Sequence, residues 1–337
     1  MDAVTAVTAV LANGTAVTAS ATENSDLFWA LRGAGPGFAV VTSFRFRTYA
    51  APAASVNWSY TYSFPTARAA ARAFLTAQTW GQQSARKELG YGILLFPGKG
   101  FLVRGVYHGA RESFDALIAP LLTLLKDAHA GVEPAKRVKT LGWIESLTEL
   151  AGSNLTTPVK GYSLHESFVR FHLLLRRCSL ARLTDGRQYA KSLVTKERAP
   201  LSLPALTALF EHLYAVSPTV PGGSSWLVIA NLYGGPGSAI NAVAAGTSSY
   251  AHRDAGYVIQ FYVGATPFDE AIVALTKGMV DALGAEAADL PAYAPYADPE
   301  LDRTQAQTRY WGGGVARLRA IKARVDPRGV LYNPQGF

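Results

Sequence analysis

The chain has 337 residues, of which 49% are hydrophobic and 17% are charged, and its formal net charge at pH 7 is +8. This composition is typical of a globular protein with a sizeable core, and it excludes a disordered chain. The basic residues are scattered and no uninterrupted apolar stretch of about 18 residues occurs, so we expect neither a nucleic acid nor a membrane as a partner.

The first residues predict a β-hairpin. Residues 7–20 alternate apolar and small polar side chains around Asn13 and Gly14, a pair that favours a type I′ turn with positive φ at both positions. No basic residues precede the apolar part of the N-terminus, so we predict no signal peptide.

The stretch "SDLFWALRGAGPGFAVVTSFRFRTY" predicts a short helix and then a strand. We expect Ser25 or Asp26 to cap the helix and the glycines to end it. Gly33, Gly35 and Gly37 do not have the G-x-G-x-x-G spacing of a dinucleotide-binding loop. They also follow a predicted helix, whereas such a loop follows a strand. From the residues alone they predict a helix-to-strand turn that needs positive φ.

The middle of the chain predicts an α+β arrangement. The linker "AAPAAS" at 50–55 is a candidate domain boundary, and strands and helices then mix with hairpin spacing rather than βαβ crossovers. Pro120 predicts a kink or break near Ala119 in the amphipathic helix that contains it. Residues 161–175 predict a strand that carries Glu166, which is either a binding carboxylate in a cleft or a solvent-facing residue.

The C-terminal segment predicts a helix that ends at Asp326, because the following proline disfavours helical backbone. Its apolar face is formed by Val315, Leu318, Ile321 and Val325, and its polar face by Arg317, Arg319, Lys322 and Arg324. The ordinary explanation for Tyr310 and Trp311, just before this helix, is a pair of core aromatics. The single cysteine, Cys178, excludes a Cys-rich metal site, and we expect no metal.

Four segments, in this order, resemble one family. They are "DLFWALRGAGPGFAVVTSFRF", "YAHRD" at 250–254, "IQFY" at 259–262 and "YWGGGVARLRAIKARVDPRGVLYN" at 310–333. Together they resemble the FAD-linked oxidases related to berberine bridge enzyme, of the vanillyl-alcohol-oxidase type. Within that family the likeness is to fungal glucooligosaccharide and chitooligosaccharide oxidases.

The resemblance implies an α+β fold, the C-terminal part of a two-lobed FAD-linked oxidase. Residues 1–50 are similar to the last part of a PCMH-type FAD-binding lobe, and residues 51–299 to a substrate-binding lobe with an antiparallel sheet flanked by helices. Residues 300–337 are similar to a berberine-type segment that returns to the flavin lobe. No residue matches the family's covalent attachment sites for FAD, so we expect the N-terminal part of that lobe to be missing from this chain. Relatives are secreted, and we expect the same of this protein if it is completed like them.

The resemblance also implies a reaction, in which a carbohydrate or alcohol carbinol gives a hydride to FAD and dioxygen is reduced to hydrogen peroxide. Tyr310 matches the catalytic tyrosine, and Glu166 and Gln260 match positions that bind sugar hydroxyls. Trp226 and Tyr262 are further candidates for substrate binding. FAD contacts are implied for six residues, namely Gly33, Gly35, Val40, Val41, Tyr332 and Asn333.

Two alternatives stay open. Val263 and Gly314 stand where the resemblance leads us to expect Asp and Asn, so the chain is either an oxidase or a non-catalytic remnant that binds sugar without flavin. The other alternative is a family oxidase that acts on a non-sugar alcohol.

Overall fold

The computed structural model describes residues 1–128, 133–151, 187–216, 225–265 and 270–337. The chain divides into two compact units. Unit 1 comprises Met1–Ala50, Ala239–Ala255 and Leu290–Phe337, and unit 2 comprises Ala51–Ser238 and Gly256–Asp289. The first division falls at the proline-containing linker. Residues 239–255 and 290–299, expected in the substrate lobe, belong instead to unit 1.

Hydrogen bonds explain why residues 239–255 belong to unit 1. The indole Nε1 of Trp29 donates to the carbonyl of Gly246 at 2.7 Å, and the hydroxyl of Ser249 donates to the carbonyl of Ala30 at 2.9 Å. Both bonds attach the 246–249 loop to a helix of the first 50 residues, a contact that no local sequence pattern records.

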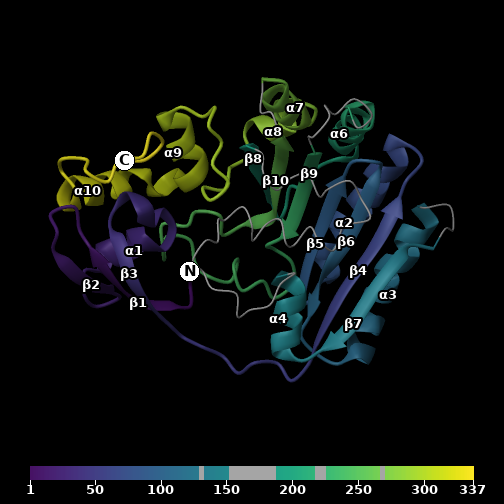
Figure 1. The fold of residues 1–337 in the computed structure, drawn as a ribbon, viewed down its shortest axis with the longest axis horizontal. Coiled ribbons are helices and arrows are strands. Elements are labelled where there is room, and N and C mark those ends of the chain that lie inside the picture. The colour runs from purple at the N-terminus through teal and green to yellow at the C-terminus, as the bar shows by residue number, and fades with distance from the viewer. Residues whose placement is uncertain (129–132, 152–186, 217–224, 266–269) are drawn as a thin grey trace. The chain divides into compact units, whose positions relative to one another are not determined.

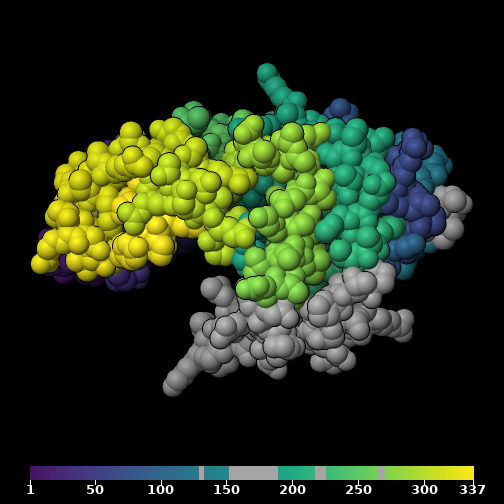
Figure 2. Space-filling model, turned by 90° about the horizontal axis from the view of Figure 1, so that it is seen from above, coloured from purple at the N-terminus to yellow at the C-terminus, as the bar shows by residue number. Residues whose placement is uncertain are grey.

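Unit 1 contains a three-stranded antiparallel sheet in the order β2-β1-β3 (Figure 1). Figure 2 shows its C-terminal residues, in yellow, lying against N-terminal residues, in purple. Its elements are β1 (Val4–Val10), β2 (Ala16–Ser20), α1 (Ser25–Ala34), η1 (Gly35–Gly37), β3 (Val40–Phe46), α9 (Arg303–Trp311), η5 (Gly312–Gly314) and α10 (Val315–Val325).

The predicted hairpin is confirmed, but its turn differs from the prediction. Gly14 has φ 84°, whereas Asn13 is not among the described residues with positive φ. The loop is closed by a bond from the N–H of Leu11 to the carbonyl of Thr15 at 2.9 Å, so it is longer than a two-residue type I′ turn. The cap of α1 also differs, because Asn24, with φ 46°, occupies the N-cap position in place of Ser25 or Asp26.

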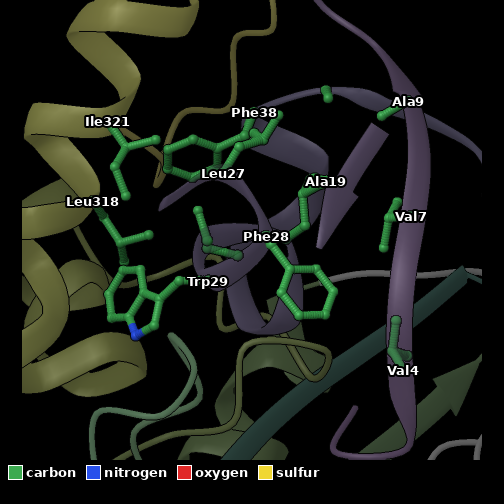
Figure 3. Packing of buried hydrophobic residues seen from close by; sticks show 14 residues of the cluster. Val4, Val7, Ala9, Ala19, Leu27, Phe28, Trp29, Phe38, Leu318 and Ile321 are labelled. Atoms are coloured by element: carbon green, nitrogen blue, oxygen red, sulfur yellow. The ribbon is translucent and has the colours of Figure 1, made fainter. Parts of the chain in front are cut away.

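Helices α1 and α10 build the core of unit 1 against β1 and β2 (Figure 3). Trp29 is 6% exposed and Leu318 is fully buried, although the two residues come from opposite ends of the chain. The apolar spacing of α10 predicts this packing, and the helix ends before Asp326 as expected. The core residues are Val4, Val7, Ala9, Ala19, Leu27, Phe28, Trp29, Ala30, Leu31, Ala34, Phe38, Ala39, Leu318 and Ile321.

Unit 2 contains a seven-stranded sheet in the order β7-β4-β6-β5-β9-β10-β8. Its strands are β4 (Ser55–Ser63), β5 (Leu89–Phe96), β6 (Gly100–Tyr107), β7 (Ala135–Leu141), β8 (Arg187–Lys196), β9 (Ser225–Leu232) and β10 (Ala255–Ala265). Its helices are α2 (Ala67–Ser84), α3 (Arg111–Ala128), α4 (Trp143–Ala151), α6 (Leu203–Val216), α7 (Glu270–Asp281) and α8 (Ala285–Ala288). The expected α+β class is confirmed. Of the kink or break expected near Ala119, the break does not occur, because α3 continues through Pro120.

One face of this sheet is covered by helices. The ring of Trp58 in β4 lies 5.6 Å from that of Phe114 in α3, and the ring of Phe101 in β6 lies 6.4 Å from that of Phe74 in α2. Because strand side chains alternate, the residues next to Trp58 and Phe101 point to the opposite face. We call that opposite face the cavity face.

Candidate functional site

The cavity face brings together two of the predicted substrate-binding residues. Gln260 of β10 lies opposite Ile229 of β9, and Tyr262 lies opposite Leu227, so all four side chains share this face. Tyr262, Leu227 and Ile229 belong to one buried cluster with Leu94. The strand alternation therefore places a phenol and an amide on one apolar surface.

The amide of Gln260 has an unsatisfied oxygen on this surface. Its side chain is 6% exposed, and its Oε1 has no hydrogen-bond partner among the described residues. A buried amide oxygen without a donor carries a desolvation cost, which a ligand hydroxyl would remove. Burial raises the pKa of Tyr262, so this phenol stays protonated at neutral pH.

A cavity of about 730 Å³ opens on the same face, within the volume range of small-molecule sites. Arg104 of β6, Ser59 of β4 and Asn231 of β9 contribute polar side chains to it. One wall comes from α4, which is attached to β4 by a bond from the hydroxyl of Ser146 to Oδ1 of Asn57 at 2.6 Å. Sequence reasoning missed Arg104, although its place two residues after Leu102 in an alternating strand could have indicated the face.

Trp226 does not belong to this surface. It lies opposite Val263, on the face of β10 that also carries Tyr257. The hydroxyl of Tyr257 donates to the carbonyl of Gln78 in α2 at 3.2 Å, which identifies that face as the helix-covered one. Trp226 is 2% exposed and packs there, so the structure corrects its expected role in substrate binding. Glu166, the other predicted sugar-binding residue, lies outside the described residues.

In unit 1 the predicted base, Tyr310, lies in a closed hydrogen-bond network. It is 3% exposed, and its hydroxyl accepts the backbone N–H of Asp298 at 2.8 Å. The same hydroxyl lies 3.4 Å from Oε1 of Gln335, which is its acceptor. Burial raises the pKa of Tyr310, while the N–H of Asp298 opposes that rise. The network connects α9 to the C-terminal tail.

A second group of tyrosines lies in unit 1, and sequence reasoning did not single it out. The ring of Tyr293 lies 6.4 Å from that of Tyr250 and 5.3 Å from that of Tyr296. The hydroxyl of Tyr250 is buried without a partner among the described residues, and burial raises its pKa. The spacing "YAPY" was the one available signal for this cluster.

The glycine-rich connection predicted to contact FAD has two different parts. None of Gly33, Gly35 and Gly37 is among the described glycines with positive φ, so the expected reason for these glycines is wrong. A Cβ at Gly33 would lie 2.4 Å from the backbone nitrogen of Tyr250, so this glycine permits close packing of two segments. At Gly35 and Gly37 an added Cβ would meet no atom within 4 Å, and their backbone is open to a ligand.

The other predicted FAD contacts differ in exposure. Val40 and Tyr332 are 56% and 68% exposed, and Val41 packs partly against the core of unit 1. The side chain of Asn333 accepts the N–H of Gln335 at 2.8 Å in a tight turn. An open glycine backbone beside an exposed valine fits a cofactor that has a diphosphate and a planar apolar ring system.

Lys322 joins the two predicted cofactor segments. Its Nζ donates to the carbonyl of Gly37 at 2.7 Å and to the carbonyl of Leu331 at 2.8 Å. It also forms an ion pair with Asp326 at 2.7 Å. Lys322 was expected on the polar face of its helix, but the residue is only 6% exposed.

The described ranges of the chain contain no group of three or more His, Cys, Asp or Glu side chains arranged to hold a metal ion. No helix in the same ranges combines the length and the hydropathy needed to cross a membrane.

Comparison with known proteins agrees with this architecture. The family model for berberine and berberine-like domains matches residues 292–337. A xylooligosaccharide oxidase of Thermothelomyces thermophilus is 34% identical over 347 residues, which cover 99% of this chain and 63% of the relative. The solved xylooligosaccharide oxidase from Myceliophthora thermophila in complex with xylobiose superposes with a TM-score of 0.82 at 31% identity, covering 99% of this chain and 66% of that structure. Residues 292–337 therefore form a berberine-like domain, and the chain as a whole is similar to oligosaccharide oxidases.

Two further relatives extend the likeness. A glucooligosaccharide oxidase of Sarocladium strictum is 30% identical and is covered over 62% of its length. The solved glucooligosaccharide oxidase of Acremonium strictum has a TM-score of 0.83 at 27% identity. The chain thus spans about 63% of the length of the curated relatives that it matches.

Proposed function

We propose that this chain provides the substrate-binding lobe and the C-terminal segment of an FAD-dependent oxidase for a carbohydrate or another alcohol. The observation that carries the proposal is the buried amide oxygen of Gln260, which lacks a donor among the described residues and shares its sheet face with the cavity. Such an acceptor suits a ligand hydroxyl. The names of the relatives, which are oligosaccharide oxidases, support the same class of substrate.

In this proposal the residues of the chain bind and orient the substrate. Gln260 accepts a hydrogen bond from a sugar hydroxyl, and the ring of Tyr262 provides an apolar surface for the sugar. Gly35, Gly37 and Val40 would hold the cofactor. A bound FAD would supply the hydride acceptor of the reaction, and dioxygen would take up the electrons to give hydrogen peroxide.

Tyr310 is the proposed base for the hydroxyl proton. A phenol with a raised pKa is almost wholly protonated at neutral pH, so the hydrogen bond that its oxygen accepts from the N–H of Asp298 would have to stabilise the phenolate. The competing hypothesis is a non-catalytic protein that binds sugar without flavin. Val263 and Gly314, which replace the expected polar residues, favour it.

The visible absorption spectrum separates the two hypotheses. The purified chain would be measured before and after addition of free FAD and desalting. A flavin band that survives desalting, with peroxide formed on a panel of oligosaccharides and simple alcohols, would support the oxidase. Saturable sugar binding by a colourless protein would support the sugar-binding alternative and contradict the oxidase for this chain.

Replacing Tyr310 with phenylalanine tests the proposed base. We expect kcat to fall about 100-fold or more, with a smaller change in KM, because the proton acceptor is lost. We also expect a stability loss of about 1 kcal/mol, because the hydrogen bond to Asp298 is lost. Peroxide kinetics and thermal unfolding would measure the two effects. Tyr293→Phe is the matched control, and a drop in kcat confined to this control would transfer the role to the second tyrosine group.

A further inference from the structure

The loop between β1 and β2 carries an acceptor sequence for N-linked glycans. Triplets of the form Asn-x-Ser/Thr occur in the chain at Asn13, Asn57 and Asn154. A triplet of this kind also arises by chance, so the surroundings of each asparagine have to distinguish an acceptor from a coincidence. Asn154 lies outside the described residues, and the other two asparagines have opposite surroundings.

Asn13 lies at the tip of the first hairpin. Residues 13–16 are exposed, and Gly14 has φ 84°, a conformation that favours glycine. A Cβ at Gly14 would meet no atom within 4 Å, so no other described segment lies against the middle of the triplet. The N–H of Leu11 donates to the carbonyl of Thr15 below the tip. A group attached at the tip would therefore leave the pairing of β1 with β2 intact.

The side chain of Asn13 leaves its amide nitrogen available. Its Oδ1 accepts the backbone N–H of Thr15 at 3.0 Å, so the first and third residues of the triplet close a turn. Nδ2 of Asn13 and the hydroxyl of Thr15 form no hydrogen bond within the described part of the chain. Both groups by which the triplet is recognised are therefore accessible to an enzyme that transfers a glycan.

Asn57 begins the same kind of triplet in the opposite environment. The residue is 7% exposed, and its Oδ1 accepts the hydroxyl of Ser146 at 2.6 Å. Its Nδ2 donates to the carbonyl of Ser146 at 3.2 Å. A glycan on this nitrogen would separate α4 from β4, because it is bulky and needs solvent. A folded chain therefore excludes a glycan at Asn57, which makes this residue an internal comparison.

We propose that Asn13 is a site of N-glycosylation. The transfer forms a bond between Nδ2 of Asn13 and the anomeric carbon of a lipid-linked oligosaccharide. It breaks the bond from that carbon to the lipid diphosphate, which leaves, while Nδ2 gives up one proton. No oxidant or reductant takes part. The inference does not depend on the oxidase hypothesis, but it requires that the protein is secreted, as we expect if it is completed like its relatives.

The test is the glycan content of the full chain, secreted from a eukaryotic host behind a cleavable leader. Peptide N-glycosidase in heavy-oxygen water converts each glycosylated asparagine into a labelled aspartate, which peptide mass spectrometry assigns to a position. We expect label at residue 13 and none at residue 57. Asn13→Gln and Thr15→Ala should each remove this glycan, whereas Thr15→Ser should keep it. Ser59→Ala is the matched control, because it removes the triplet of Asn57 and should leave the glycan at Asn13 unchanged.

Three results would overturn the inference. The first is a secreted chain in which Asn13 is unmodified. The second is label at residue 13 that survives in Thr15→Ala. The third is label at residue 57 of the folded chain, which would show that burial does not decide between the triplets. If the chain is not exported, the purified folded chain would be given to microsomes with a lipid-linked oligosaccharide, and failure of transfer to Asn13 would also count against the inference.

Discussion

Replacing Lys322 with methionine should lower the free energy of unfolding of unit 1 by about 3–5 kcal/mol. The methionine can fill similar space, but it leaves Asp326, which is 2% exposed, without its cation. It also removes the donor shared by the carbonyls of Gly37 and Leu331. Denaturant unfolding of the wild type and the variant, monitored by tryptophan fluorescence, would measure the loss.

Arg324→Met is the matched control for this variant. Arg324 lies on the same helix and pairs with Asp26 at 3.2 Å, but its side chain is 61% exposed. An exposed ion pair contributes about 0–1 kcal/mol, so this control should unfold close to the wild type. Equal losses in Lys322→Met and Arg324→Met would contradict a stabilising role for the buried network.

The stabilisation by the ion pair of Lys322 and Asp326 should depend on pH in a definite direction. Burial opposes ionisation of Asp326, but the ammonium of Lys322 and the N–H groups of Leu331 and Val330 outweigh it and lower the pKa to about 2. A folded-state pKa below the unfolded value stabilises the protein above pH 4, and this stabilisation is lost as the pH falls towards 2. The difference between wild type and Lys322→Met should therefore shrink at pH 2.5.

Replacing Gly33 with alanine should destabilise unit 1 by about 1–3 kcal/mol, the usual cost of overpacking. The new Cβ would lie 2.4 Å from the backbone nitrogen of Tyr250 and 2.5 Å from the hydroxyl of Ser249. Backbone cannot move aside as a flexible side chain can, so the 249–250 loop would have to separate from α1. Thermal unfolding would show the loss.

Gly35→Ala separates this effect from a general intolerance of alanine. Gly35 has φ −42°, in the right-handed helical region, and its Cβ would meet no atom within 4 Å. Alanine is compatible with that backbone and restricts the unfolded chain, so stability should stay level or rise by about 0.4–1 kcal/mol. If both variants have the same stability, the close approach of Tyr250 does not explain why residue 33 is a glycine. If Gly35→Ala weakens flavin binding without a stability loss, the open backbone serves the cofactor.

The local elements could be predicted because their causes are local. Alternation around Gly14 predicts the first hairpin, and helical spacing of Leu318 and Ile321 predicts the face that α10 buries. The four segments also indicate the family resemblance, because each combines several residue types in a fixed order. The same resemblance singles out Gln260 as a candidate site residue, and the strand pairing places it on one face with Tyr262.

Contacts between segments distant in sequence decided which side chains are buried and which face they lie on. Strand register decides that Trp226 and Gln260 lie on opposite faces of the sheet, and a shift of one residue would reverse this. Packing against the 249–250 loop, and not a turn with positive φ, explains Gly33. Lys322 has the sequence signature of a solvent-facing residue, yet carbonyls from two other segments surround it. The sequence by itself therefore determined the elements and the family resemblance. Only the tertiary structure decided which polar groups are buried and which face the cavity. The reason is that burial depends on the segments that meet at a residue rather than on its neighbours along the chain.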